Sequence, residues 1–263
     1  MKIGFYQFCP RHGDPAGNLE LIKEGLAGSQ FDLLVLPELA STGYLFDEPT
    51  ELYKISEPAN GSGPFLRGLT EIARTHRACI VSGFSERLDD ALYNSAAAVD
   101  ENGVLCVYRK VHLFNTEKEL FSAGDRGFPV FYFQQVCLGM MICFDWVFPE
   151  AARSLALKGA QILCHPANLV LPWCQTAMVT RSLENTIFSI TANRTGAESG
   201  QALALNFTGR SQILSPRGEL LAQAGENDQD LRIVDIDPAD SLNKRFSAGN
   251  DLFADRRPAQ YQL

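Results

Sequence analysis

Short apolar runs alternate with amphipathic stretches along most of the chain. Apolar runs between turn-forming residues are typical of strands, and apolar positions three and four residues apart are typical of helices. The runs predict strands over residues 2–8, 32–36, 79–84, 92–99, 104–108, 130–133, 136–142, 161–165, 187–193, 211–215, 219–224 and, as the last strand, 231–236. Helical spacing predicts helices over residues 18–26, 64–76, 149–158 and 173–185.

Turn-forming residues mark the ends of several of these elements. The sequence Asp-Glu-Asn-Gly at 100–103 joins two strand candidates, which is typical of a hairpin, and Pro-Arg-Gly at 216–218 joins another pair. Pro149 stands near the start of a predicted helix, where its missing N–H is harmless, and Gly159 ends that helix. These boundaries predict many short strands with a few helices between them.

Strands mixed with flanking helices favour two sheets packed together with helices outside them. The pattern alone does not choose this arrangement over a Rossmann-like layering. No linker rich in Gly and Ser or in charge interrupts the 263 residues, and 46% of them are hydrophobic, enough for a sizeable core. We therefore expect a single α/β domain over residues 1–263.

Composition excludes several kinds of partner. The formal net charge of −8 argues against a nucleic-acid binder, which needs a basic face for phosphates. No apolar stretch approaches the roughly 20 residues of a membrane span, and residues 1–10 lack the apolar core of a signal peptide. An odd number of cysteines, seven, without a CxxC pair favours reduced thiols in the cytoplasm and no structural zinc. The sequence contains no GxGxxG, P-loop or HExxH motif, so no such motif predicts a cofactor or a metal.

Three polar residues follow apolar strands at positions where layered α/β folds present functional groups. Glu38 follows the run at 32–36, Lys110 the run at 104–108 and Cys143 the run at 136–142. Taken singly, they are more often a solvated acid, an exposed cation and a small core residue. Together they suit a nucleophilic thiol with a carboxylate base and a cation for the oxyanion.

The same residues lie in segments that resemble the three signature regions of the nitrilase, or carbon–nitrogen hydrolase, superfamily. These segments read VLPELASTGY, YRKVHLF and MMICFDWVFPEAARSLALKGA. Later segments, HPANL, RSLENTIFSITANRTG and NDLFADRRPAQY, are also similar to the family. The resemblance implies a four-layer αββα sandwich and a catalytic triad of Glu38, Lys110 and Cys143.

The resemblance also implies a second glutamate that positions the lysine and assists proton transfer. In TEKELFSAGD the candidates are Glu117 and Glu119, and the family spacing of seven residues before Gly124 favours Glu117. The alternative for Glu117 is a surface charge in a polar loop.

Four residues are candidates for substrate binding, and they are Tyr44, Phe144, Trp146 and Asn168. Phe144 begins the segment after the nucleophile whose backbone N–H groups help hold the oxyanion in the family. Tyr44 and Trp146 are candidates for the acyl pocket, with ordinary core packing as the alternative, and Asn168 follows a strand at the expected rim. His112 and His165 suggest a Cys–His pair, but the interpretation as structural, hydrogen-bonded histidines is preferred.

The resemblance implies hydrolysis of a small aliphatic amide through a thioester, releasing acid and ammonia without a metal or organic cofactor. Small aliphatic nitriles and N-carbamoyl amines are the alternative substrates. A non-catalytic binding protein and an acyltransferase are the alternatives from other classes. The resemblance also implies a homodimer or higher homo-oligomer in which the tail at 247–263 crosses to the partner.

Overall fold

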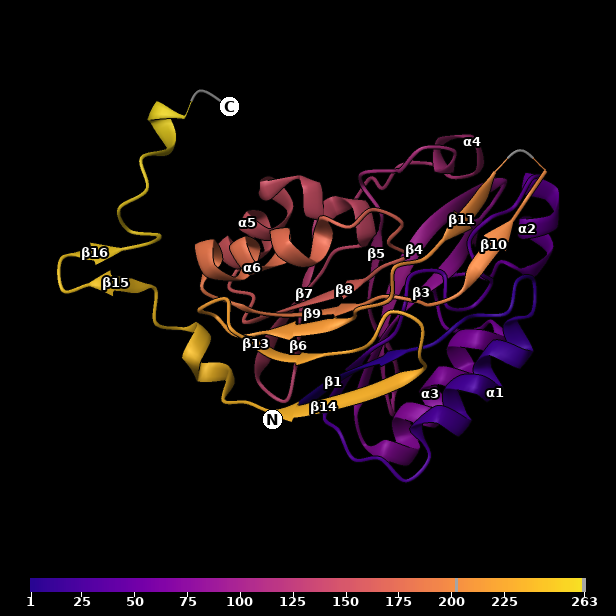
Figure 1. Cartoon of the computed structure of the whole chain (residues 1–263), viewed down its shortest axis with the longest axis horizontal. Helices are drawn as coiled ribbons and strands as arrows, with labels where there is room; N and C mark the ends of the chain where they lie inside the picture. Colours follow the sequence, from indigo (N-terminus) through magenta and orange to yellow (C-terminus); the bar gives the residue numbers. More distant parts are fainter. Residues whose placement is uncertain (202, 262–263) are drawn as a thin grey trace.

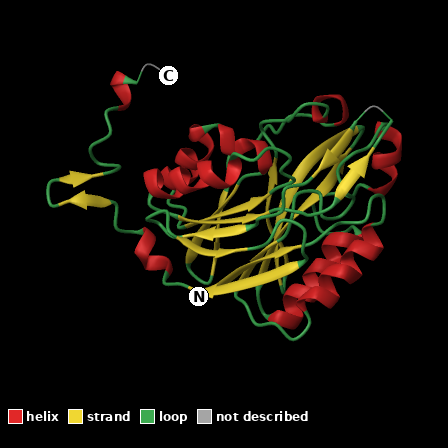
Figure 2. Cartoon of the chain, viewed as in Figure 1, coloured by secondary structure: helices red, strands yellow, loops and turns green. Residues whose placement is uncertain are grey.

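Two six-stranded sheets lie face to face, with helices on both outer faces (Figures 1 and 2). The computed structural model describes residues 1–201 and 203–261. The first sheet has the order β14-β1-β2-β3-β4-β5 and the second β13-β12-β9-β8-β7-β6. The expected four-layer αββα sandwich is confirmed, and the Rossmann-like alternative is wrong, because the strands form two sheets instead of one.

The strands of the first sheet are β1 (Lys2–Gln7), β2 (Leu33–Val35), β3 (Cys79–Leu88), β4 (Ala91–Asp100), β5 (Gly103–Arg109) and β14 (Asp230–Asp235). Those of the second are β6 (Val130–Phe133), β7 (Val136–Met140), β8 (Ile162–Pro166), β9 (Phe188–Ala192), β12 (Gln212–Leu214) and β13 (Leu220–Gln223). The main helices are α1 (Pro15–Leu26), α3 (Pro64–His76), α5 (Pro149–Leu157) and α6 (Cys174–Asn185). The predicted strands and helices are present at these places, with ends shifted by a few residues.

Alternation along the strands of the first sheet divides the core into layers. Phe5 and Val35 point inward and join one cluster with residues of the second sheet, such as Met140. Their neighbours Tyr6 and Leu34 point outward and pack under α1 and α3. Because successive side chains face opposite sides of a strand, one apolar run serves both layers, which is why these runs are continuously apolar.

Each sheet has parallel strands at its centre and antiparallel strands at its edges. β1, β2 and β3 are parallel to one another, as are β7, β8 and β9. The carboxyl ends of the parallel strands β2 and β7 therefore open onto loops of the kind that carry functional groups in layered folds.

Several short elements were not predicted. They are α2 (Pro49–Ile55), α4 (Glu117–Leu120), β10 (Ala197–Ser199), β11 (Ala204–Asn206), β15 (Arg245–Ser247), β16 (Asn250–Asp251) and the 3₁₀ turns η1 (Cys143–Val147), η2 (Pro238–Ser241) and η3 (Pro258–Gln260). The expectation that 231–236 holds the last strand is wrong, since β15 and β16 follow it. These strands have two or three residues and few buried positions, so they show no clear alternation.

The tail after η2 runs away from the body of the protein (Figure 1). Its hairpin of β15 and β16 is largely exposed, and Phe246 is 54% exposed. Further along the tail, the centre of the Phe253 ring lies 5.3 Å from the Arg153 guanidinium of α5. Residues 262–263 of the predicted interface tail lie outside the described residues. Within the described part of the chain, every helix is too short or too polar to cross a bilayer.

Candidate active site

Glu38 is held at the end of β2 by the neighbouring strand. The Leu36 N–H donates to the Val81 carbonyl at 2.8 Å, and the Gly83 N–H donates to the Pro37 carbonyl at 3.0 Å. A Cβ on Gly83 would lie only 2.5 Å from the Glu38 Cα, so only glycine lets the two segments approach this closely. Glu38 is consequently fixed in the interior with no exposed surface.

Lys110 follows β5, and its backbone is held on both sides. Its N–H donates to the Asn94 carbonyl, and its carbonyl accepts from the Gly124 N–H, both at 2.8 Å. A Cβ on Gly124 would lie 2.1 Å from the Arg109 carbonyl oxygen. Gly124, which the family spacing uses to select Glu117, is therefore required where the loop returns against the backbone beside Lys110.

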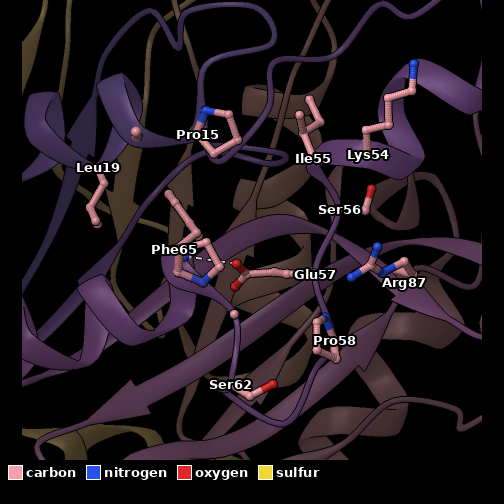
Figure 3. A pocket seen from close by; sticks show the side chains of 13 residues that line it. Pro15, Leu19, Lys54, Ile55, Ser56, Glu57, Pro58, Ser62, Phe65 and Arg87 are labelled. Carbon is pink, nitrogen blue, oxygen red and sulfur yellow. Dashed lines mark hydrogen bonds between the residues drawn. The ribbon is translucent and has the colours of Figure 1, made fainter.

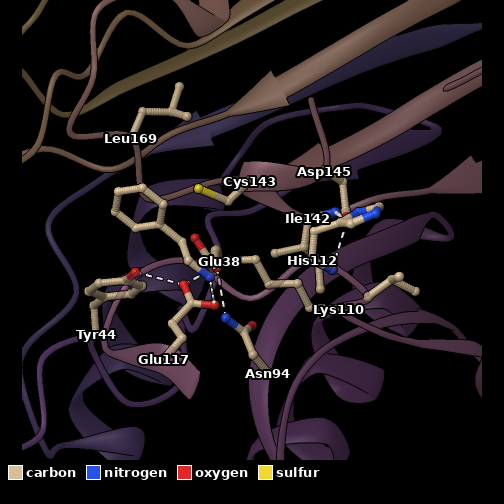
Figure 4. A network of polar contacts seen from close by, with 12 residues as sticks. Glu38, Tyr44, Asn94, Lys110, His112, Glu117, Ile142, Cys143, Asp145 and Leu169 are labelled. Atoms are coloured by element: carbon tan, nitrogen blue, oxygen red, sulfur yellow. Dashed lines mark hydrogen bonds and ion pairs between the residues drawn. The ribbon is translucent and has the colours of Figure 1, made fainter. Parts of the chain in front are cut away.

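Cys143 opens η1 after β7 in a left-handed backbone conformation, with φ 39°. The buried Asp145 carboxylate holds this bend, because it accepts from the Ile142 N–H at 2.8 Å and the Tyr108 hydroxyl at 2.6 Å. It also contacts the His112 ring at 2.7 Å. Asp145 thus ties the loop of Cys143 to the loop of Lys110 (Figure 4). Positive φ is uncommon for residues other than glycine, and such conformations are concentrated at functional sites.

The Lys110 ammonium lies at the centre of the site, between two carboxylates (Figure 4). Its Nζ donates to Glu38 Oε1 at 2.6 Å and to Glu117 Oε1 at 2.7 Å. The Tyr44 hydroxyl donates to the same Glu117 oxygen at 2.6 Å, and Asn94 Nδ2 donates to Glu38 Oε1 at 2.7 Å. Charge-assisted bonds of this length in a buried network fix each group tightly.

The structure separates the two candidates for the second glutamate. Glu117 begins α4, is 3% exposed and belongs to the network around Lys110. Glu119, two residues further on, is exposed. The geometry therefore favours Glu117, as the spacing to Gly124 does.

The pKa shifts follow from burial and from the shared cation. Burial raises the pKa of Glu38 above its usual value, although Lys110 pulls it down. Burial opposes the Lys110 ammonium, but Glu117 and Glu38 outweigh it and raise its pKa. Burial and the Glu38 charge raise the pKa of the Cys143 thiol. Cys143 is thus a neutral thiol at rest beside a carboxylate of raised basicity, the arrangement that proton transfer from thiol to Glu38 requires.

His165 has its ring nitrogens engaged with neighbouring groups. Its Nδ1 lies 3.1 Å from the Thr191 hydroxyl and its Nε2 lies 3.0 Å from the Cys143 carbonyl oxygen. Burial lowers the pKa of His165 to about 4, so the ring is neutral at physiological pH. The ring supports the backbone of Cys143 and is not positioned as a base for its thiol.

Several buried polar atoms of the site have no partner among the described residues. They are Glu38 Oε2, Asn94 Oδ1 and both side-chain polar atoms of Asn168. The backbone N–H of Asn168 faces Cys143 and favours its thiolate. Asn168 is only 2% exposed, so it lies in the interior beside the thiol and not at the expected rim. Buried polar atoms are costly when unpaired, so these atoms point to a polar substrate.

The comparisons with known proteins agree on one family. The family model described as carbon-nitrogen hydrolase matches residues 2–244. A protein named Nitrilase from Pyrococcus abyssi is 43% identical over 266 residues, covering 99% of each chain. This chain belongs to the carbon–nitrogen hydrolase family. An (R)-stereoselective amidase from a Pseudomonas species is also similar, at 34% identity over 98% of this chain and 92% of the relative.

Solved structures of similar fold include an amidase with an active-site cysteine. An amidase from Nesterenkonia sp. superimposes on this hydrolase with a TM-score of 0.82, at 29% identity over 99% of this chain and 95% of that one. A variant of that amidase carries acrylamide added at its active-site cysteine. The carbon–nitrogen hydrolase fold is therefore one on which a cysteine is known to react.

The aromatic candidates of the hydrolase lie in different surroundings. The Phe144 ring lies 5.1 Å from the ring of Phe114, and both side chains are partly buried. Trp146 packs against the main core, and its carbonyl accepts from Arg181 Nε at 3.2 Å. The Tyr44 ring packs in an apolar cluster that includes Phe207, and its hydroxyl donates to Glu117.

Asn94 and the carboxylate of Asp145 belong to the site but were not assigned a role from the sequence. Asn94 occupies a buried position of β4, where an apolar residue is expected. A polar residue at an inward position of an otherwise apolar strand is a signal that could have identified it. Among the described residues, no cluster of His, Cys, Asp or Glu is arranged to hold a metal ion.

Proposed function

We propose that this hydrolase cleaves short, uncharged aliphatic primary amides through a thioester on Cys143, releasing the carboxylic acid and ammonia. The observation that carries the proposal is the buried cluster of Glu38, Lys110 and Glu117 beside the thiol. Cys143 itself is only 6% exposed, which favours a small substrate.

In the first half-reaction, the Cys143 sulfur attacks the amide carbon while Glu38 takes the thiol proton. The carbonyl oxygen becomes an oxyanion, which the Lys110 ammonium and backbone N–H groups of η1 stabilise. The C–N bond then breaks, and Glu38 returns the proton to the leaving ammonia. Glu117 holds Lys110 in place throughout this step.

In the second half-reaction, Glu38 removes a proton from water as the water oxygen attacks the thioester. The C–S bond breaks, and the proton returns from Glu38 to the Cys143 sulfur. The carboxylic acid leaves and the thiol is restored. Two steps with modest barriers replace one difficult hydrolysis.

The unpaired acceptors of the site support amides over nitriles. Asn94 Oδ1, Asn168 Oδ1 and Glu38 Oε2 can accept hydrogen bonds from the two N–H groups of a primary amide. A nitrile has no N–H group and would leave buried acceptors unpaired. Sites built for a hydrogen bond discriminate strongly against analogues that lack it.

The charges of the site support an uncharged acyl group. Lys110 is already shared by Glu38 and Glu117, so one negative charge remains in excess around the thiol. A substrate carboxylate there would be repelled and desolvated without a cation to pair with it.

Nitriles are the second candidate, because a relative at 43% identity is named Nitrilase.

Ammonia release from a matched panel tests the proposal. The panel contains short aliphatic amides, the corresponding nitriles and N-carbamoyl amines. We expect kcat/KM for the amides to exceed that for the nitriles by about 100-fold or more, because only the amides satisfy the buried acceptors. Preferential nitrile turnover would overturn the amide assignment, and silence across the panel would overturn the substrate class.

We also propose that residues 1–263 form one domain that assembles as a homodimer or higher homo-oligomer through the tail at 247–263. The extension of this tail from the body supports its docking on another subunit (Figure 1). The seven cysteines are all free thiols, which supports the reducing cytoplasm as the location.

Light scattering checks the assembly. We expect at least a dimer at micromolar concentration, and a shift toward monomer together with a lower Tm when the chain is truncated after Phe246, because the exposed tail would lose its partner surface. A full-length monomer would contradict the assembly, and a truncated protein that keeps the assembly state would contradict the role of the tail.

A further inference from the structure

Glu198 is a nearly buried carboxylate far from the catalytic residues in the sequence. It lies in β10, is 8% exposed and faces the loop that follows Glu38. Its Oε2 accepts from the Tyr44 N–H at 2.9 Å and from the Leu45 N–H at 2.7 Å. A single side chain therefore fixes two successive peptide groups of that loop.

Arg194 forms an ion pair with this carboxylate and neutralises its charge. It follows β9, has no exposed surface and pairs with Glu198 through its guanidinium. The same guanidinium lies 4.1 Å from the centre of the Phe207 ring, and that ring meets the Tyr44 ring edge-on at 6.0 Å. Two independent contacts thus lead from Arg194 to Tyr44, one through a carboxylate and one through an aromatic ring.

The backbone of the loop is adapted to this carboxylate. Gly43 has φ +78°, and a Cβ there would lie 2.9 Å from Glu198 Oε1 and 3.0 Å from the His12 Cα. Any other residue would be strained and would press against neighbouring groups. This close approach fits a loop after Glu38 that is held in one conformation by Glu198.

We infer that Glu198, held by Arg194, is a positioning residue for the catalytic network. This inference rests on the proposed function. The chain of contacts runs from Glu198 to the Tyr44 backbone, from the Tyr44 hydroxyl to Glu117, and from Glu117 to Lys110. Every link is a hydrogen bond or ion pair between groups less than a tenth exposed.

The chemical consequence concerns the position of the Lys110 ammonium. When the Tyr44 hydroxyl is withdrawn, the partners that Glu117 keeps among the described residues are Lys110 and the Phe114 N–H, which donates to its Oε2 at 3.2 Å. Glu117 is then free to rotate, and Lys110 moves with it toward or away from the oxyanion. Displacements of about 1 Å in such a group cost up to ~10²-fold in rate.

The test compares Glu198→Gln, Tyr44→Phe and the double variant in amide hydrolysis. We expect each single variant to lower kcat by about 10- to 100-fold with KM changed by less than about threefold, since positioning for the transition state is lost while substrate binding is kept. Because both act through one contact, the double variant should be no slower than the slower single variant. Multiplying effects would overturn the inference, because they would mean independent roles.

Glu57→Gln is the matched control. Glu57 is 6% exposed and accepts from the N–H groups of Phe65 at 2.9 Å and Leu66 at 2.7 Å, so it resembles Glu198 in burial and in its two backbone donors (Figure 3). It lies beside a cavity of about 600 Å³ at the start of α3, outside the network of Lys110. We expect kcat within about twofold of the wild type. A loss as large as that of Glu198→Gln would show a general effect of destabilisation and overturn the inference.

A second measurement separates this inference from the proposed substrate. Alkylation of Cys143 by methyl vinyl ketone, which has no amide group, followed by mass spectrometry of the Cys143 peptide, depends on Glu38 and Lys110 but on no amide substrate. We expect Glu198→Gln to slow it by about tenfold and Glu57→Gln to leave it unchanged. If the wild type hydrolyses no amide, but alkylation is slowed in Glu198→Gln and unchanged in Glu57→Gln, the proposed function is wrong and the positioning role of Glu198 stands. Equal rates in both variants overturn the role itself.

If Glu198→Gln does not fold, the paired variant Arg194→Met with Glu198→Gln carries the same test. It leaves no buried charge without a partner, the usual reason that such a variant unfolds. Its alkylation rate should be lowered in the same way, and a wild-type rate overturns the inference.

Discussion

Replacing Cys143 with alanine is expected to lower amide turnover by at least about 10⁴-fold while the protein stays folded. The thioester cannot form without the sulfur, and what remains is whatever help Lys110 and the backbone of η1 give to direct attack by water. The side chain is small and sits in a well-packed cluster, so its loss leaves the core nearly intact. The measurement is ammonia release together with thermal unfolding.

Cys174→Ala is the matched control for this result. Cys174 is also a buried cysteine of the same core cluster, but it lies in α6 and takes no part in the network of Lys110. It should keep turnover within about twofold of the wild type. A Cys143→Ala protein that retains more than a few hundredths of wild-type activity would refute the covalent mechanism.

Glu38→Gln is expected to lower kcat by about 10²- to 10⁴-fold. Glutamine has nearly the shape of glutamate and can keep one bond to Lys110, but it cannot accept a proton from the thiol or from water. The raised pKa of Glu38 makes its carboxylate a stronger base. Because this base acts on the thiol in the first half-reaction and on water in the second, its loss should slow both. Single-turnover measurements should show slow acylation and slow deacylation.

The same substitution is expected to stabilise the protein above acidic pH. The pKa of Glu38 is raised in the folded state, so its contribution to stability is present at low pH and is lost as the pH rises through the folded pKa. Glutamine does not titrate. The Tm of Glu38→Gln minus that of the wild type should therefore grow from acid toward neutral pH and then level off.

Thermal unfolding of both proteins between about pH 5 and pH 8 checks this difference. A Tm difference that shrinks as the pH rises would mean that the pKa of Glu38 is lowered by Lys110, contrary to the effect of burial. A Glu38→Gln protein that loses activity but gains no stability would show that Lys110 requires both carboxylates as partners in the folded state.

The central part of the site was predictable because its residues interrupt strong local patterns. Glu38 and Cys143 lie three residues after the last residues of β2 and β7, and Lys110 comes directly after β5. The resemblance to the carbon–nitrogen hydrolases then selected Glu117 from the spacing to Gly124. In each case the decisive information lay within a few residues of the side chain concerned.

Glu198 could not be found in this way, because its environment is created by segments far away in the sequence. It lies between Ala197 and Ser199 in a strand of three residues, where a carboxylate is normally a solvated charge. Its burial depends on the backbone of Tyr44, 154 residues earlier, although its ion-pair partner Arg194 lies only four residues before it. Asp145 is similar, since its partners Tyr108 and His112 lie 37 and 33 residues earlier in the sequence. Local periodicity carries no information about such contacts.

The short helices escaped prediction for a different reason. α2 has seven residues with only Leu52 fully buried, and α4 has four residues with Glu117 as its buried side chain. A helix this short shows less than two turns of spacing, so its apolar period cannot be distinguished from chance. Isolated helices of this length are unstable in water, so both helices depend on tertiary contacts that a local pattern does not show.

The pairing of β1 with β14 has a consequence for the synthesis of the protein. β1 leaves the ribosome long before its antiparallel partner, which is residues 230–235. At ~5–20 residues per second, the far edge of β1 stays uncovered for roughly ten to forty-five seconds. An open strand edge is a template for pairing with other chains. The edge of β1 that pairs with β14 in the folded enzyme is therefore open to other chains while the protein is being synthesised, and it is covered once residues 230–235 have folded onto it.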